Sequence, residues 1–245
     1  MAARILSVLS HPERIVPDET EPGIVALHRK RYEFALPFCD GRDVLDGACG
    51  AGYGSALLAT RARRVLGVDR SVEAIAYARR RYVADNLEFA EMDLLALGLP
   101  AASFDLVCAF ETIEHVDDRE RYLAEVRRVL RAGGVYLVST PQVARTTEAP
   151  ANPFHRVEYS RDDFEALLRR HFGSVELYGQ RRLQTRRHRA MQRLDVLGLR
   201  RRLPFLRRGS ALLGTAPTAE LTSADLVISR DGLERASELV AVCRP

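Results

Sequence analysis

Three aspartates end short apolar runs that read as strands. Asp46 closes RDVLD, Asp69 closes RVLGVD, and Asp93 follows NLEFAEM. Because parallel strands end at one edge of a sheet, we expect the three carboxylates to line one crevice. Carboxylates accept hydrogen bonds from hydroxyl and amino groups, and they attract positive charge. The pattern therefore favours a cationic ligand that carries no phosphate.

A glycine-rich turn follows Asp46 in the sequence DGACGAGYG. Gly50 and Gly52 lack a Cβ, so they tolerate positive φ and let a ligand approach the backbone. A dinucleotide loop of the form G-x-G-x-x-G would place its third glycine where this chain has Ser55. An NAD-dependent oxidoreductase is therefore disfavoured.

A second group of chemical residues follows the apolar run FDLVCAF. Glu111, Glu114 and His115 stand at i, i+3 and i+4, so one helical turn would bring their side chains to one face. With His155 from NPFHRVEYS as fourth ligand, they would form a site for Mg²⁺ or Mn²⁺. The metal-free alternative makes His115 a general base, with Glu111 as the second catalytic candidate. Glu114 would then cap a helix or close the acceptor pocket.

The elements that position these residues alternate along the chain. Short apolar runs and helical patterns succeed each other between residues 44 and 140, which is typical of βαβ units. The expected strands are RDVLD, RVLGVD, NLEFAEM, FDLVCAF, GVYLVST, SVELYGQ and LVAVC. The expected helices cover residues 24–38, 52–62, 71–83, 118–131 and 160–172, the fourth ending at a Gly133–Gly134 cap. The pattern predicts an α/β fold with a doubly wound, mostly parallel, seven-stranded sheet.

A single domain accounts for the whole chain, because 245 residues with 47% hydrophobic composition suffice for one core. Its expected parts are an N-terminal helical lid, a cofactor-binding core, a basic helical insertion and a C-terminal strand region. They cover residues 1–40, 41–180, 181–223 and 224–245. Arg31 and Tyr32 in the lid are candidates for contact with one end of a cofactor.

Basic charge is concentrated in residues 181–208, which hold eleven arginines and one acid. A solvated helical lid over the site is the first interpretation. An interfacial helix on an anionic membrane surface is the second, because leucines lie among the arginines. Nucleic acid is the less favoured partner, since few aromatic side chains are available to stack on bases.

Cellular location follows from what the sequence lacks. No apolar run approaches the roughly 20 residues of a membrane span, and charged residues interrupt the N-terminal apolar run before a signal peptide could form. The spacing of the four cysteines matches no zinc motif, so we expect core thiols in a reducing compartment. The predicted location is cytoplasmic, with peripheral contact to the inner membrane face through the basic segment as an option.

Taken in order, the motifs DGACGAG, GVD, MD, FDLVCAFETIEHV and LRAGGVYLVSTP resemble the class I S-adenosylmethionine-dependent methyltransferases over roughly residues 40–180. The type 11 and ubiquinone-biosynthesis O-methyltransferases are similar members. The E-x-x-E-H pattern with His155 downstream resembles small-RNA 2′-O-methyltransferases, which hold a metal over a vicinal diol. Ala48 departs from the family, which more often has glycine there.

The resemblance implies S-adenosylmethionine as cofactor and assigns residues to its parts. Asp46 and the loop would hold the amino-acid end, Asp69 the ribose, and Met92 with Asp93 the adenine. The implied cofactor residues are Asp46, Gly47, Ala48, Gly50, Gly52, Asp69, Met92 and Asp93.

The predicted function is O-methylation of a hydroxyl on a sugar or glycan, assisted by a divalent metal. Two alternatives stay open: a metal-free small-molecule O- or N-methyltransferase, and an RNA 2′-O-methyltransferase. Methylation of a base amino group is disfavoured, because Phe110–Ile113 lacks an N-P-P-Y type motif.

Overall fold

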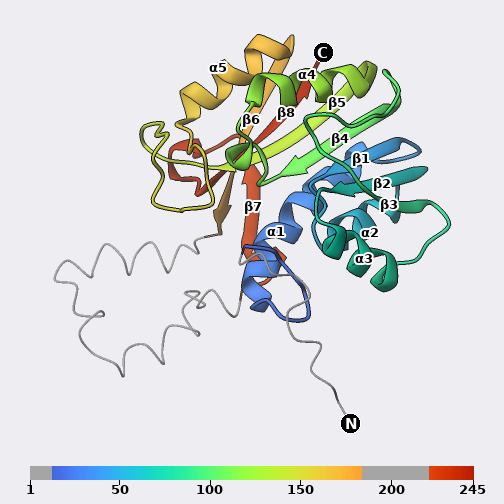
Figure 1. Cartoon of the computed structure of the whole chain (residues 1–245). Coiled ribbons are helices and arrows are strands. Elements are labelled where there is room, and N and C mark those ends of the chain that lie inside the picture. The colour runs from blue at the N-terminus through green and yellow to red at the C-terminus, as the bar shows by residue number, and fades with distance from the viewer. Residues whose placement is uncertain (1–12, 184–220) are drawn as a thin grey trace, which may run out of the picture.

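A computed structural model describes residues 13–183 and 221–245. One sheet of eight strands runs through these residues, with helices on both faces (Figure 1). Its strands, from edge to edge, are β3 (Leu87–Glu91), β2 (Arg64–Asp69), β1 (Asp43–Gly47), β4 (Phe104–Phe110), β5 (Leu130–Pro141), β8 (Glu238–Arg244), β6 (Ser174–Arg182) and β7 (Leu226–Ser229).

The first five strands in this order pair in parallel, so their carboxyl ends share one edge of the sheet. β8 is antiparallel to both β5 and β6, and β7 is antiparallel to β6. The doubly wound, mostly parallel sheet is thereby confirmed. The predicted number of seven strands was one too few, because the four residues of β7 are recognisable only from their pairing with β6.

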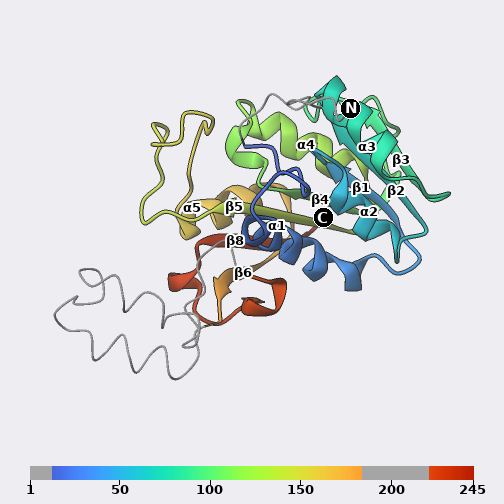
Figure 2. The same ribbon diagram turned by 90° about the horizontal axis from the view of Figure 1, so that it is seen from below.

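Helices divide between the two faces of the sheet, and each face has its own apolar core. Tyr32, Leu58 and Ile75 belong to the first core, whereas Tyr122 and Phe164 belong to the second. α1 contacts α2, and Figure 2 shows α1 and α4 on opposite sides of the sheet. The first face carries α1 (Pro22–Ala35), α2 (Tyr53–Ala59) and α3 (Val72–Arg81), and the second carries α4 (Arg119–Val129) and α5 (Arg161–His171).

The end of α4 differs from its prediction. The helix stops at Val129, and β5 begins at Leu130 without an intervening loop. Gly133 has φ +76°, but it lies inside β5 rather than beyond a helix. The glycine pair therefore bends the start of a strand and does not cap α4.

The segment before α1 crosses the carboxyl edge of the parallel strands. Arg14 lies 3.8 Å from Asp69 at the tip of β2, and Glu13 lies 3.9 Å from His115 beyond β4. Between these contacts and α1, Val16 is buried. Residues 13–21 form turns and the helix begins only at Pro22, so the described part of the predicted helical lid is partly irregular.

The basic insertion lies mostly outside the described residues, which resume at Leu221. Its interpretations as lid, membrane-binding helix or nucleic-acid contact therefore stay predictions. None of the helices within the described ranges has the length and apolar character needed to cross a bilayer. The expectation of core thiols is confirmed for all four cysteines, which are free and buried: Cys39, Cys49, Cys108 and Cys243.

Candidate active site

The glycine loop joins β1 to α2 and turns through left-handed backbone. Ala48, Gly50 and Gly52 have φ of +54°, +55° and +82°. A Cβ on Gly52 would lie 2.6 Å from the Cβ of Ala78 and 2.8 Å from the ring of Phe89, whereas one on Gly50 would meet nothing within 4 Å. The loop is thus packed tightly against α3 and β3 on one side and is open on the other.

Asp69 ties this loop to the start of α3. Its Oδ2 accepts a hydrogen bond from the Gly50 amide at 3.0 Å, and its Oδ1 accepts one from the Ser71 amide at 2.9 Å. Each carboxylate oxygen can accept a second hydrogen bond. Although Asp69 is largely buried, it therefore retains the capacity to bind a ribose diol beside the loop.

Met92 and Asp93 follow the tip of the neighbouring strand, β3. Met92 is partly buried against the second core, while Asp93 is exposed and accepts a hydrogen bond from the Leu95 amide at 2.9 Å. An apolar side chain thus adjoins an accessible carboxylate at this tip, and this pair of groups suits an adenine ring and its amino group.

Asp46 lies in the interior beneath the loop and is not exposed at the edge of the sheet. It is fully buried and accepts hydrogen bonds from Ser55 Oγ at 2.6 Å and Tyr32 Oη at 3.3 Å. Burial raises the pKa of Asp46 to about 7. Asp46 therefore joins β1 to α1 and α2, and any effect on a cofactor passes through the loop. Gly47 is similarly enclosed, since a Cβ there would lie 3.1 Å from Leu94.

Replacing Asp46 with asparagine is expected to remove a pH dependence of stability. Because the folded pKa of about 7 exceeds that of an unfolded aspartate, Asp46 favours folding at pH 4, and this contribution is lost as the pH rises towards 7. The loss is on the order of 2 to 4 kcal/mol. Urea unfolding of Asp46→Asn and the native chain at several pH values measures it. A stability difference between the two that stays constant from pH 4 to 7.5 would contradict the prediction.

Replacing Ala48 with glycine is expected to stabilise the chain by about 0.5 to 1 kcal/mol, because alanine is strained at positive φ. Ala51 provides the matched control, since it lies in the same loop and is absent from the positive-φ residues. Ala51→Gly should lose stability. Equal shifts of the urea midpoint in the two variants would refute the strain argument.

Glu111, directly after β4, is a second strained position, with φ +51°. Its Oε1 accepts a hydrogen bond from Ser139 Oγ at 2.6 Å, and its Oε2 lies 3.8 Å from Arg31 Nη2. A short 3₁₀ turn begins only at Ile113 and ends at His115. Left-handed backbone at Glu111 therefore breaks the helical phase that the sequence prediction assumed for residues 111–115.

Glu114 lies in the interior, close enough to Glu111 for their charges to interact. Its side chain is fully buried, and burial together with the charge of Glu111 raises its pKa well above the usual range. The Glu114 carbonyl accepts a hydrogen bond from the Arg156 amide at 2.7 Å, which ties the loop after β5 to this turn. Within the described part of the chain, the ligand atoms that lie within 4.8 Å of one another belong to Glu13, His115 and His155, so the four predicted metal ligands do not form one cluster.

The two histidines of that prediction do come together. Their rings are 4.8 Å apart and nearly perpendicular, and one acid, Glu13, lies within 3.9 Å of both His115 and His155. Burial lowers the pKa of His115, which favours the neutral imidazole. Sequence reasoning missed Glu13, because its segment has no periodic pattern that would place it at the strand edge.

Arg31 enters the same region from α1. It is 1% exposed, and its Nη2 lies 2.9 Å from His28 Nδ1. Nη1 lies 3.4 Å from Gln180 Oε1, and among the described residues Nε has no hydrogen-bond partner. A buried guanidinium whose Nε–H has no partner among the described residues is suited to bind a carboxylate.

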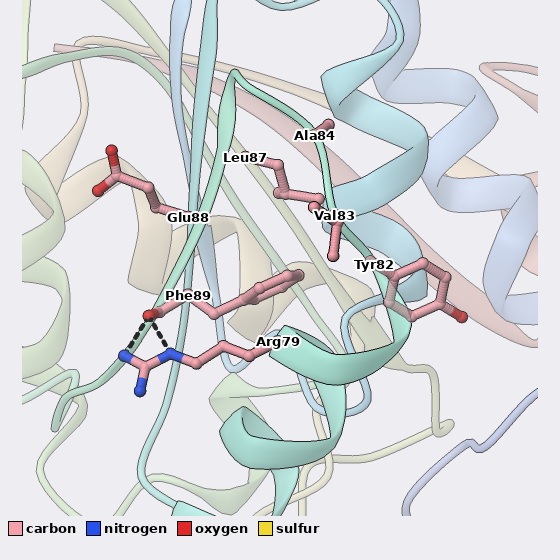
Figure 3. A pocket seen from close by; sticks show the side chains of 7 residues that line it. All are labelled: Arg79, Tyr82, Val83, Ala84, Leu87, Glu88 and Phe89. Carbon is pink, nitrogen blue, oxygen red and sulfur yellow. Dashed lines mark hydrogen bonds between the residues drawn. The ribbon is translucent and has the colours of Figure 1, made fainter.

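A separate hollow lies at the opposite end of β3 (Figure 3). There Arg79 donates two hydrogen bonds to the Phe89 carbonyl, at 3.0 Å and 2.6 Å. None of the predicted site residues lines this hollow, so it is distinct from the predicted site. Its lining residues are Arg79, Tyr82, Val83, Ala84, Leu87, Glu88 and Phe89.

The doubly wound, mostly parallel sheet with helices on both faces defines a Rossmann-like α/β protein. Residues 45–138 match the family described as the methyltransferase domain. The chain is 40% identical to a probable S-adenosylmethionine-dependent methyltransferase of Mycobacterium tuberculosis and 39% identical to one of Mycolicibacterium smegmatis. Each alignment covers 160 residues, which is 64% of this chain. The family match and these relatives confirm the resemblance to the class I S-adenosylmethionine-dependent methyltransferases.

These alignments span 58% and 62% of the two relatives' lengths, about three fifths in each case. Among solved structures, an S-adenosylmethionine-dependent methyltransferase from Thermotoga maritima is similar, with a TM-score of 0.62 at 17% identity. That similarity covers 92% of this chain and 94% of the other, and it supports the fold alone. The family implies S-adenosylmethionine as the cofactor, whereas the roles of individual residues stay predictions.

Proposed function

We propose that this protein transfers a methyl group from S-adenosylmethionine to a hydroxyl oxygen, with a sugar or glycan as the preferred acceptor. The observation that carries the proposal is the pair of imidazoles, His115 and His155, just beyond the tip of β4. Carboxylates suited to the cofactor follow the tips of β2 and β3 at the same edge. The imidazoles that activate the acceptor and the carboxylates that bind the cofactor would thus lie next to one another.

The residues at this edge fit the cofactor. Asp69 would accept the ribose hydroxyls, Asp93 and Met92 would contact the adenine, and the open side of Gly50 would receive the methionine chain. The spare donors of Arg31 would pair with the cofactor's carboxylate. When bound, the sulfonium supplies an electrophilic methyl group for in-line displacement.

A hydroxyl acceptor must lose its proton as the new bond to carbon forms. The His115 imidazole would accept that proton directly, or it would bind a metal that holds the hydroxyl and lowers the pKa of the hydroxyl. An amine acceptor is already nucleophilic, so it needs neither a general base nor a metal. The imidazole pair therefore favours a hydroxyl over an amine.

The sugar preference is supported by a hollow of about 470 Å³ between the starts of α4 and α5. Acidic, hydroxyl and guanidinium groups in its wall, such as Asp117, Thr146 and Arg170, are suited to bind a polyol. A metal-free small-molecule methyltransferase and an RNA 2′-O-methyltransferase remain the alternatives. The RNA alternative depends on the basic segment, which lies outside the described residues.

Two measurements test the proposal in order. Calorimetry with S-adenosylhomocysteine and with NAD first establishes the cofactor, and binding of NAD alone would reject the methyltransferase. Transfer of labelled methyl groups to oligosaccharides, small amines, small phenols and RNA then identifies the acceptor. We expect label on the oligosaccharide oxygen, and exclusive labelling of amines would overturn the hydroxyl assignment.

A further inference from the structure

The residues around His115 form a different metal site from the one that the sequence suggested. Glu13, His115 and His155 each offer a ligand atom within 4.8 Å of one from both others. The carboxylate lies 3.9 Å from each imidazole, and tetrahedral ligands with bonds of about 2.1 Å are about 3.4 Å apart. A displacement below about 1 Å would therefore complete the coordination.

Neighbouring groups already orient the two imidazoles. Glu158 accepts the Nδ1 hydrogen of His155 at 2.9 Å, which directs the Nε2 lone pair towards Glu13. His115 Nδ1, the atom that lies 3.9 Å from Glu13, donates its hydrogen to the Phe154 carbonyl at 3.0 Å, and metal binding through this atom would replace that hydrogen bond. His155 already has the partner on its second nitrogen that usually fixes the tautomer and the ring of a metal-binding histidine.

One donor already lies between two of the candidate ligands. The amide nitrogen of Asn152 is 2.5 Å from Glu13 Oε1 and 3.0 Å from His155 Nε2. The other carboxylate oxygen of Glu13 is buried and has no hydrogen-bond partner among the described residues. Glu13 Oε1 and His155 Nε2 share the Asn152 donor, and Glu13 Oε2 has none. A bound cation would interact with these atoms together.

We propose that Glu13, His115 and His155 bind a divalent transition metal, with Glu158 as a positioning residue. Two imidazoles and one carboxylate suit Zn²⁺, Co²⁺ or Mn²⁺ better than Mg²⁺, which prefers oxygen. The partial exposure of Glu13 and His115 leaves positions for water or an acceptor oxygen. Metal binding stands on this geometry alone, whereas a role in activating the acceptor rests on the proposed function.

Calorimetric and spectroscopic titration of the metal-free full chain with Co²⁺ tests the site. We expect one ion per chain, an absorption spectrum typical of nitrogen and oxygen ligands, and weaker binding of Mg²⁺. Glu13→Gln and His155→Gln should each lower the Co²⁺ affinity at least tenfold, and Glu158→Gln should lower it roughly 10- to 100-fold.

Two variants make the test specific. Glu114→Gln should leave the affinity unchanged, whereas the four-residue site predicted from sequence requires its loss. His171→Gln controls for nonspecific binding of Co²⁺ to histidine, because His171 bonds to Glu120 and is not part of the proposed site. The absence of Co²⁺ binding, or equal affinity in Glu13→Gln, His155→Gln and the native chain, would overturn the site. Binding of S-adenosylhomocysteine, measured in parallel, shows whether the methyltransferase proposal survives independently.

Discussion

Replacing Asp69 with alanine is expected to lower the affinity for S-adenosylhomocysteine by about 100- to 10,000-fold. A hydrogen bond to a charged group contributes roughly 1.5 to 3 kcal/mol, and a ribose diol would make two to this carboxylate. Each 1.4 kcal/mol corresponds to about a tenfold change in affinity. The same substitution releases the Gly50 amide, which would loosen the loop that receives the methionine chain.

Calorimetry on three variants separates these contributions. Asp69→Asn keeps one acceptor oxygen and should bind with intermediate affinity, whereas Asp93→Ala removes one exposed carboxylate and should cost about tenfold. Asp85→Ala, at an exposed position before β3, should bind like the native chain. An Asp69→Ala protein that remains folded and binds within twofold of the native chain would show that the ribose lies elsewhere.

The fold was predictable because its signals are local. Each parallel strand is a short apolar run that ends in a polar residue, and the capped helices begin at recognisable positions. Asp118 accepts from the Arg121 amide and Ser160 from the Asp163 amide. Buried parallel strands alternating with amphipathic helices leave few other topologies. The strand β7 escaped prediction because its only support is pairing with a strand more than forty residues earlier.

The cofactor side of the site was more predictable than the acceptor side for the same physical reason. Asp69 and Asp93 follow the ends of strands, so the sheet itself places them at one edge. Glu111 and Glu114 depend on the backbone of an irregular turn, where one residue at φ +51° changes the direction of every side chain that follows. Glu13 reaches His115 across about 100 residues of sequence, and no local pattern encodes such a contact.

The contacts of Arg31 could not be predicted from the sequence. In the sequence it is one of several charged residues of an amphipathic helix. In the fold it is buried against Glu111, whose own carboxylate is held by Ser139 on β5. The ion pair thus connects α1 to the tips of β4 and β5. The position of α1 and the conformation of Glu111 therefore depend on each other through this buried ion pair.

Replacing His115 with glutamine is expected to lower kcat by about 100- to 10,000-fold, the range for loss of a proton acceptor. The affinity for S-adenosylhomocysteine should change less than twofold. The contacts of His115 are to Phe154, Glu13 and His155, all on the acceptor side, and none is to the glycine loop. The predicted signature is a loss of turnover with unchanged cofactor binding, measured by single-turnover transfer to the acceptor identified above.

His171→Gln is the matched control, because within the described ranges its imidazole bonds only to Glu120, at the junction of α4 and α5. Its kcat should remain within twofold of the native value. Addition of Co²⁺ to His115→Gln distinguishes the two uses of the imidazole: a metal ligand can be partly replaced by excess metal, whereas a general base cannot. If His115→Gln turns over as fast as His171→Gln, neither use is correct, and the acceptor oxygen must lose its proton to another group.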